Sequence, residues 1–104
     1  MLWHIVRFRF PPGVDDGDRQ ALEASLRSLA GRVPTLRFLR VARSLDEPHV
    51  TGLLTGFDDA AGLATYRDHP DHLPVASRAG ELCREITRLD LVTDDPPDAL
   101  PPTD

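Results

Sequence analysis

Hydrophobic and polar positions alternate along residues 1–10, and this alternation predicts a β-strand. By the two-residue period of a strand, one face holds Leu2, His4, Val6, Phe8 and Phe10. Trp3 and Ile5 make the first half of the opposite face apolar as well. We therefore expect this strand to be covered on both sides.

An acidic cluster at residues 15–18 opens a predicted helix that runs to about residue 30. Aspartates at a helix start supply N-cap side chains and interact favourably with the positive end of the helix dipole. Leu22, Leu26 and Leu29 form an apolar stripe along one side of this helix. Gly31 is the predicted stop.

Two strands are predicted next, over residues 36–45 and 49–57, with a turn at residues 46–48. In the second of these strands, one face holds His49, Thr51, Leu53, Thr55 and Phe57. The opposite face of this strand holds Val50, Gly52, Leu54 and Gly56.

The rest of the pattern predicts a helix broken by a proline and a last strand. A short helix ends near Tyr66, because the residue before Pro70 avoids the helical conformation. A further helix is expected over residues 73–84, and a strand over residues 86–93. The order is then β-α-β-β-α-β, which is the plan of a ferredoxin-like α+β fold with a four-stranded antiparallel sheet.

This plan leaves one face of the sheet without helices. If the strand registers hold, that face carries the large apolar residues Trp3, Ile5, Leu54, Leu89 and Leu91. A monomer rarely leaves such a patch in water, so we expect a twofold homodimer through the sheet face. The domain is expected over residues 1–95, and the acidic, proline-rich residues 96–104 are expected to form a disordered tail.

Composition narrows the class of protein. The chain has 104 residues, 40% of them hydrophobic, which is typical of one globular domain. No membrane span or leader segment is predicted, and the single cysteine, Cys83, cannot form an internal disulfide, so a cytoplasmic location is expected. A net charge of −5 argues against a nucleic-acid partner. All 12 basic residues are arginine, which suggests a GC-rich bacterial genome.

Polar residues on apolar faces are the candidates for chemistry. His4 lies on the strand face that should meet the helices, and Asp90 lies among apolar same-face neighbours in the last strand. Tyr66 and His72 flank the helix break. A pocket between the sheet and the helices could gather these four side chains.

Two segments carry a resemblance to a known family. The opening strand, Leu-Trp-His-Ile-Val-Arg-Phe-Arg-Phe at residues 2–10, and the element Tyr66-x-x-His69-Pro70-x-His72 resemble the stress-responsive dimeric α/β-barrel (Dabb) family over roughly residues 1–93. The resemblance implies a ferredoxin-like subunit whose sheet pairs with a twin to close a barrel. Family members include plant stress proteins without settled chemistry, a polyketide cyclase and a hydroxynitrile lyase.

The resemblance also implies catalytic roles. His72 matches the proposed base of the cyclase, Tyr66 matches the tyrosine that holds a carbonyl oxygen, and Asp90 matches an aspartate of the last strand. Aldol closure needs a base near neutral pH and a donor to the enolate oxygen, which histidine and tyrosine supply. A carboxylate behind the imidazole fixes its tautomer. We therefore expect His72 as base, Tyr66 as oxyanion donor and Asp90 as the residue that orients His72.

The positions implied for substrate binding depart from the cyclase in part. A second pocket histidine of the cyclase falls on Thr51, and His49, two residues earlier on the same face, is the candidate replacement. Aromatic pocket residues fall on residues 22, 23 and 26, which are not aromatic here, so a different substrate is expected. The implied substrate-binding residues are His4, Phe8, Leu22, Leu26, Thr51, Leu53 and His49.

Taken together, these residues predict a cofactor-independent cyclase or lyase that acts on a polyketide-like or other carbonyl compound. The alternatives are a non-catalytic stress-responsive protein that binds a small ligand on the same barrel, and a cofactor-free oxygenase. An open pocket that His72 and Tyr66 both face favours an enzyme, and a filled one favours a binding protein. No metal site is expected, because Pro70 separates His69 from His72 and no helix sets their faces.

Overall fold

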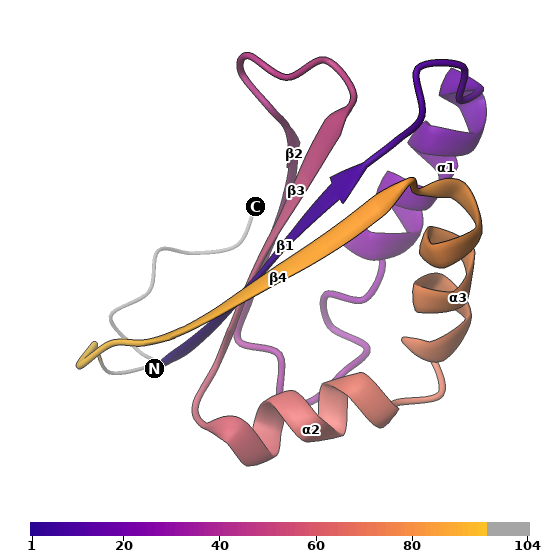
Figure 1. Ribbon diagram of the computed structural model, residues 1–104. Coiled ribbons are helices and arrows are strands. Elements are labelled where there is room, and N and C mark those ends of the chain that lie inside the picture. The colour runs from indigo at the N-terminus through magenta and orange to yellow at the C-terminus, as the bar shows by residue number, and fades with distance from the viewer. Residues whose placement is uncertain (96–104) are drawn as a thin grey trace.

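The computed structural model describes residues 1–95, and the predicted tail at residues 96–104 lies outside the described residues. Seven elements follow one another along the chain (Figure 1): β1 (Leu2–Arg9), α1 (Asp16–Arg27), β2 (Phe38–Arg43), β3 (Val50–Phe57), α2 (Ala60–Asp68), α3 (Leu73–Leu82) and β4 (Glu85–Val92). The strands form one antiparallel sheet in the order β2-β3-β1-β4. This is the predicted ferredoxin-like α+β fold.

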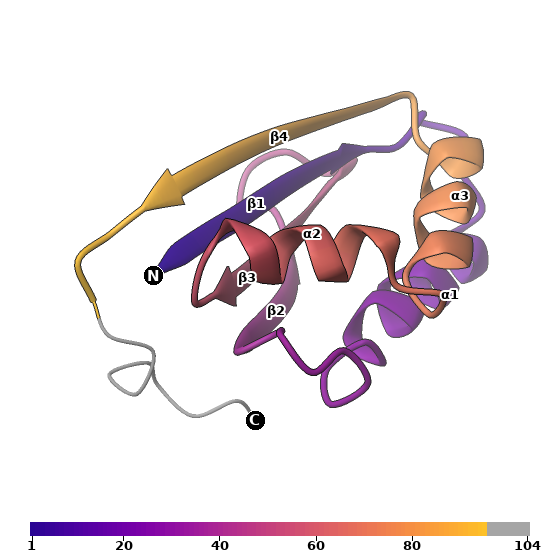
Figure 2. The ribbon, with the colours of Figure 1, turned by 90° about the horizontal axis from the view of Figure 1, so that it is seen from below.

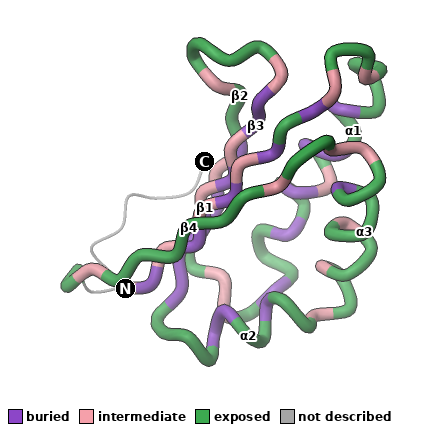
Figure 3. Tube along the Cα trace, in the orientation of Figure 1, coloured by how far each residue is buried: buried purple, intermediate pink, exposed green. Residues whose placement is uncertain are grey.

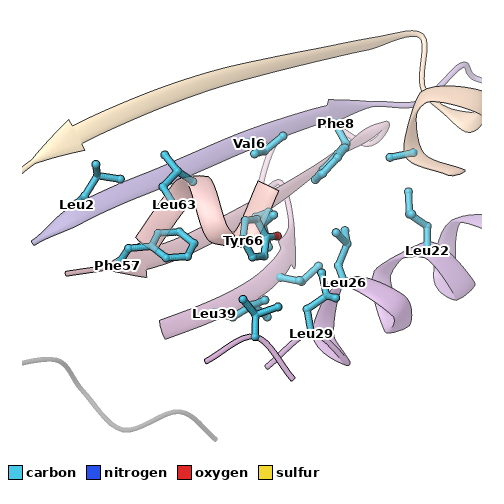
Figure 4. Packing of buried hydrophobic residues seen from close by; sticks show 14 of the residues in the cluster. Leu2, Val6, Phe8, Leu22, Leu26, Leu29, Leu39, Phe57, Leu63 and Tyr66 are labelled. Atoms are coloured by element: carbon cyan, nitrogen blue, oxygen red, sulfur yellow. The ribbon is translucent and has the colours of Figure 1, made fainter. Parts of the chain in front are cut away.

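All three helices lie on the same side of the sheet (Figure 2). Helices α1 and α3 lie beside each other at one end, and α2 runs along the sheet below β1 and β3. The side chains of β1 that face the helices are buried, and they meet the leucine stripe of α1 and the buried face of α2 (Figure 4). The predicted faces of the first strand and of the leucine helix are therefore confirmed.

Helix α1 is shorter than predicted and ends at Arg27. Beyond it, the backbone N–H groups of Leu29 and Ala30 donate to carbonyls only three residues back, at 3.2 Å in both cases, which marks tight turns in place of a continued α-helix. Gly31 follows with a φ of 82°, a conformation that a residue with a Cβ rarely adopts. The helix therefore ends four residues before the predicted stop, and Gly31 instead takes the left-handed conformation in the turns that follow the helix.

The outer face of the sheet carries the predicted apolar side chains. Ile5 lies opposite Leu54 on one side and Leu89 on the other, and Trp3 lies opposite Leu91, so these residues share one face. Trp3 also stacks edge-on against Phe38 at 5.5 Å between ring centroids. Strand β4 forms the edge of the sheet and is exposed along most of its length (Figure 3).

A buried polar network, which the sequence pattern did not predict, joins α1 to the β2–β3 hairpin. Arg19 and Glu23 lie on the inner side of α1, and each is only 4% exposed. Arg19 donates to the hydroxyl of Thr51 at 3.0 Å, and that hydroxyl donates to Glu23 at 2.8 Å. Arg43 completes the network with a donor 2.9 Å from Glu23. Every charged group in the network therefore has a partner, as burial of charge requires.

Candidate functional site

A cavity of about 290 Å³ opens between the inner face of the sheet and the three helices. Its buried wall comes mainly from apolar side chains, and its rim contains exposed residues of α2, α3 and β4. The lining residues are His4, Val6, Phe8, Leu26, Leu53, Tyr66, Arg67, His72, Ala76, Ala79, Ile86 and Arg88. Three of the four residues singled out from the sequence therefore line one cavity.

His4 lies in the first half of β1, on the face that meets the helices, and is 4% exposed. Antiparallel pairing places His4 directly opposite Asp90 of β4. The His4 Nδ1 lies 2.5 Å from the Asp90 carboxylate, which can only accept, so Nδ1 carries the proton. The second oxygen of Asp90 lies 3.4 Å from the guanidinium of Arg67.

The expected pairing of Asp90 with His72 was wrong, because the register of β1 and β4 gives Asp90 to His4 instead. His72 precedes the first turn of α3 at the N-cap position. Its Nδ1 lies 3.1 Å from the backbone carbonyl of Arg67, to which it donates. The backbone carbonyl of Arg67 thus orients the His72 ring, which is the role that was expected of the Asp90 carboxylate.

This hydrogen bond fixes the tautomer of His72. With the proton on Nδ1, the lone pair of the neutral ring lies on Nε2, the nitrogen that can accept a proton. Burial lowers the pKa of His72 below its ordinary value of 6.5, more than the hydrogen bond to the Arg67 carbonyl raises it. The ring is therefore neutral at neutral pH and fit to act as a base.

Tyr66 lies in the last turns of α2 and is 1% exposed. Its ring centroid is 4.3 Å from that of His72, 5.3 Å from that of Phe57 and 6.5 Å from that of His4. The hydroxyl is buried, and among residues 1–95 no hydrogen-bond partner reaches it. Burial raises the pKa of Tyr66 to about 12, so the hydroxyl keeps its proton. Figure 4 shows this oxygen on the side of the ring away from Phe57 and toward Leu26.

The structure separates the predicted substrate-binding residues into two groups. His4, Phe8, Leu26 and Leu53 line the cavity. Three others, Leu22, Thr51 and His49, lie outside this lining.

Each of these three has a different place. Leu22 is 1% exposed and packs in the core. Thr51 faces inward, but its hydroxyl is held by Arg19 and Glu23. His49 precedes β3 at the hairpin end and lines a separate hollow with Arg84, so it does not replace the missing second histidine.

Two charged residues of the cavity lining, Arg67 and Arg88, were not among the predicted site residues. Arg88 lies two residues before Asp90 and pairs opposite Val6, so strand period alone places it on the inner face. His69 lies outside this lining, and its Nδ1 accepts the backbone N–H of Asp71 at 3.0 Å. Across residues 1–95 no group of three or more metal-ligating side chains is assembled.

The fold and cavity define a class: a ferredoxin-like α+β subunit with a pocket between its sheet and its helices. Within this class, the sequence matches the family described as the stress responsive A/B barrel domain (Dabb) over residues 2–93. The chain therefore belongs to the Dabb family, which confirms the resemblance carried by its opening strand and its His-Pro-x-His element. None of the curated proteins matches the sequence.

Several solved structures share the fold. A dimeric ferredoxin-like protein of unknown function from a Jannaschia species is 27% identical, with a TM-score of 0.75, over 89% of this chain and 100% of the other. A hydroxynitrile lyase from Passiflora edulis is 16% identical, with a TM-score of 0.79, over 90% and 94% of the two chains. A candidate antibiotic biosynthesis monooxygenase from Chloroflexus aurantiacus is 17% identical, with a TM-score of 0.74, over 92% and 96%.

These neighbours differ in their described activities, so the shared fold does not select one activity for this chain. Within the part of the chain that is described, no helix has the length and apolar character needed to cross a membrane. The choice of function therefore depends on the chemistry of the cavity.

Proposed function

We propose that this protein is a cofactor-independent acid–base enzyme that acts on a carbonyl compound, as a cyclase or a lyase. The observation that carries the proposal is the buried, unpartnered hydroxyl of Tyr66 beside the neutral imidazole of His72, in one cavity. A buried donor without a partner costs folding free energy, and such costs are common where a ligand supplies the missing partner.

For a cyclase, the proposed first step is removal of a proton from the carbon beside a carbonyl group. The proton goes to Nε2 of His72, and the electron pair of the C–H bond moves to the carbonyl oxygen to form an enolate. Tyr66 donates its hydroxyl proton in a hydrogen bond to that oxygen without losing it, since burial raises the pKa of Tyr66 to about 12.

In a cyclase, the enolate carbon then attacks a second carbonyl carbon of the same molecule. A C–C bond forms, and the new alkoxide takes the proton back from His72. In a lyase for cyanohydrins, His72 takes the hydroxyl proton, the C–CN bond breaks, and cyanide leaves with that proton. In each reaction His72 takes up one proton and later gives it back, so neither reaction requires a metal or an organic cofactor.

His4 is proposed to contact the substrate and not to start the reaction. Its Nδ1 is taken up by Asp90, which fixes the ring and leaves Nε2 for the cavity. Asp90 acts through His4 and is thus proposed as a positioning residue, in place of the role beside His72 expected from the sequence.

We propose that the chain forms a homodimer through the outer face of its sheet. Leu89 is 54% exposed and Leu91 is 44% exposed, beside Trp3 and Ile5 on the same face. Burial of this patch against a second copy would remove large apolar side chains from water. The dimeric description of the Jannaschia protein supports this assembly. A cytoplasmic location remains our expectation from the lone, part-buried Cys83.

The test compares two histidine variants whose substituted residues lie three positions apart in the sequence. Wild type, His72→Ala and His69→Ala are each incubated with a short poly-β-ketone thioester and, separately, with mandelonitrile. Products are followed by mass spectrometry, and circular dichroism checks that all three proteins are folded. We expect turnover of at least one substrate by wild type and His69→Ala, because His69 lies outside the cavity lining.

Loss of that turnover in folded His72→Ala supports the proposal. Product profiles that match the protein-free control, or equal rates in wild type and His72→Ala, contradict it. Binding of the thioester without turnover would favour the non-catalytic ligand-binding protein.

A further inference from the structure

The rim of the cavity carries an arginine that no acidic side chain neutralises. Arg88 lines the cavity, and among residues 1–95 it has neither an ion pair nor a hydrogen bond through its guanidinium. The protein as a whole is acidic, with 17 Asp and Glu residues against 12 Arg. Arg88 therefore faces the cavity without an anionic partner, although the chain carries an excess of carboxylates.

The other arginines show how readily this chain pairs its cations. Carboxylate partners lie within 4 Å of Arg7, Arg9, Arg19, Arg37, Arg43, Arg67 and Arg78. Among residues 1–95, Arg27, Arg32 and Arg84 resemble Arg88 in having no carboxylate within 4 Å, but none of the three lines this cavity. The nearest carboxylate along β4, Asp90, is shared between His4 and Arg67.

The charge around the opening is therefore positive. Arg67 and Arg88 bring two guanidinium groups to the rim, and among residues 1–95 Asp90 is the one carboxylate within 4 Å of either, at 3.4 Å from Arg67. Deeper in the cavity, the walls are apolar, with Phe8, Leu26 and Leu53. A molecule that fits such a site has an apolar body and an anionic group at one end.

We propose that Arg88 is the anion-binding residue of this cavity and that the ligand is a small organic carboxylate. The planar guanidinium can donate two parallel hydrogen bonds to a carboxylate, which fixes both its position and its orientation. The carboxylate would remain at the rim, and the apolar body would lie against the inner wall. This inference rests on the proposed function in that it names the substrate class of the same cavity.

The position of Arg88 also links the anion to the chemistry. The positive charge of Arg88 contributes to the lowered pKa of His72, after the larger effect of burial. A bound carboxylate would neutralise that charge beside the imidazole. The substrate would thus strengthen the base as it binds, since a nearby anion favours the protonated form of histidine.

The test is a binding measurement that needs no turnover. Isothermal titration calorimetry is used to measure the Kd of 2-naphthoate and of its neutral analogue 2-naphthamide. The two probes share the apolar body and differ in charge. The proteins are wild type, Arg88→Gln and Arg32→Gln, and the last removes the same charge from an exposed site outside the cavity.

We expect wild type to bind the carboxylate about tenfold more tightly than the amide. Arg88→Gln should lose this preference while its affinity for the amide stays unchanged, and Arg32→Gln should keep the preference. In wild type, an increase in salt from about 50 to about 500 mM should weaken binding of the carboxylate but not of the amide. If Arg88→Gln does not fold, this salt dependence still shows whether wild type binds the carboxylate through its charge.

Equal affinity of wild type for the two probes overturns the inference, as does a preference that survives in Arg88→Gln. Failure of both probes to bind overturns it as well. These outcomes are separate from those of the proposed function. A carboxylate preference in a protein without turnover refutes the enzyme alone, and turnover without the preference refutes the carboxylate subsite alone.

Discussion

Substitution of Tyr66 by phenylalanine should make the protein more stable and less active. The Tyr66 side chain is 1% exposed, and its hydroxyl has no hydrogen-bond partner among residues 1–95. A buried donor left without a partner costs about 1–3 kcal/mol of stability. Phenylalanine keeps the ring contacts with Phe57 and His72 and removes only this cost.

The expected gain for Tyr66→Phe is about 1 kcal/mol in the free energy of unfolding, after allowance for the small void left by one oxygen atom. For a domain of this size, the gain corresponds to a rise in Tm of about 4–8 °C. Urea unfolding followed by circular dichroism measures the change, with all proteins at one concentration because dimerisation would contribute to stability.

Tyr66→Leu is the matched control, because it removes the ring together with the hydroxyl. This variant should lose about 2 kcal/mol or more, since it leaves a cavity in the core. If Tyr66→Phe instead lost about 1 kcal/mol, the hydroxyl would have to be bonded in the folded protein. It would then not be a free donor for an enolate oxygen, and the reasoning behind the proposed function would be refuted.

Three further predictions follow from the same structure. Glu23→Gln should lose about 2 kcal/mol or more in urea unfolding, because it leaves Arg19 buried without its anion. Burial raises the pKa of Glu23, but hydrogen bonds from Arg43 and Thr51 lower it by more, so the pKa lies below the ordinary value of 4.5. The stability of wild type should therefore fall as the pH drops below 4.5, and the stability of Glu23→Gln should fall less. Because the pKa of His72 is lowered from 6.5, any turnover should fall only at pH below 6.5 and stay constant above it. Leu89→Asp should shift the sedimentation coefficient from dimer toward monomer, and an unchanged dimer would refute the sheet-face interface.

The parts of the site that local periodicity controls could be predicted from the sequence. The two-residue period of β1 placed His4 and Phe8 on the inner face, and both line the cavity. Pro70 predicted the break between α2 and α3, which brings the rings of Tyr66 and His72 to 4.3 Å.

The parts that depend on contacts between distant segments could not be predicted in this way. Asp90 was assigned to His72, whereas its partner is His4, which lies 86 residues away in the chain. This pairing depends on the register between β1 and β4. Periodicity fixes which face a side chain occupies, but not which residue it meets on the neighbouring strand.

The buried charges of α1 show a second limit. Arg19 and Glu23 lie on the same helix face as Leu22 and Leu26, so their spacing could have indicated burial. Charged residues are usually assigned to solvent, and burial becomes acceptable only when every partner is present. Here one of these partners is Thr51, whose hydroxyl accepts from Arg19 and donates to Glu23. The hydroxyl is therefore not free for the substrate-binding role expected from the sequence.

The central claim is that His72 and Tyr66 act on one reacting centre, and a double-mutant cycle tests it most directly. Initial rates of cyclisation of the poly-β-ketone thioester are measured for wild type, Tyr66→Phe, His72→Ala and the double variant. We expect each single variant to be slower by about a hundredfold. The double variant should be about as slow as His72→Ala alone, because the two groups serve the same step. Single variants that keep the wild-type rate would contradict the account.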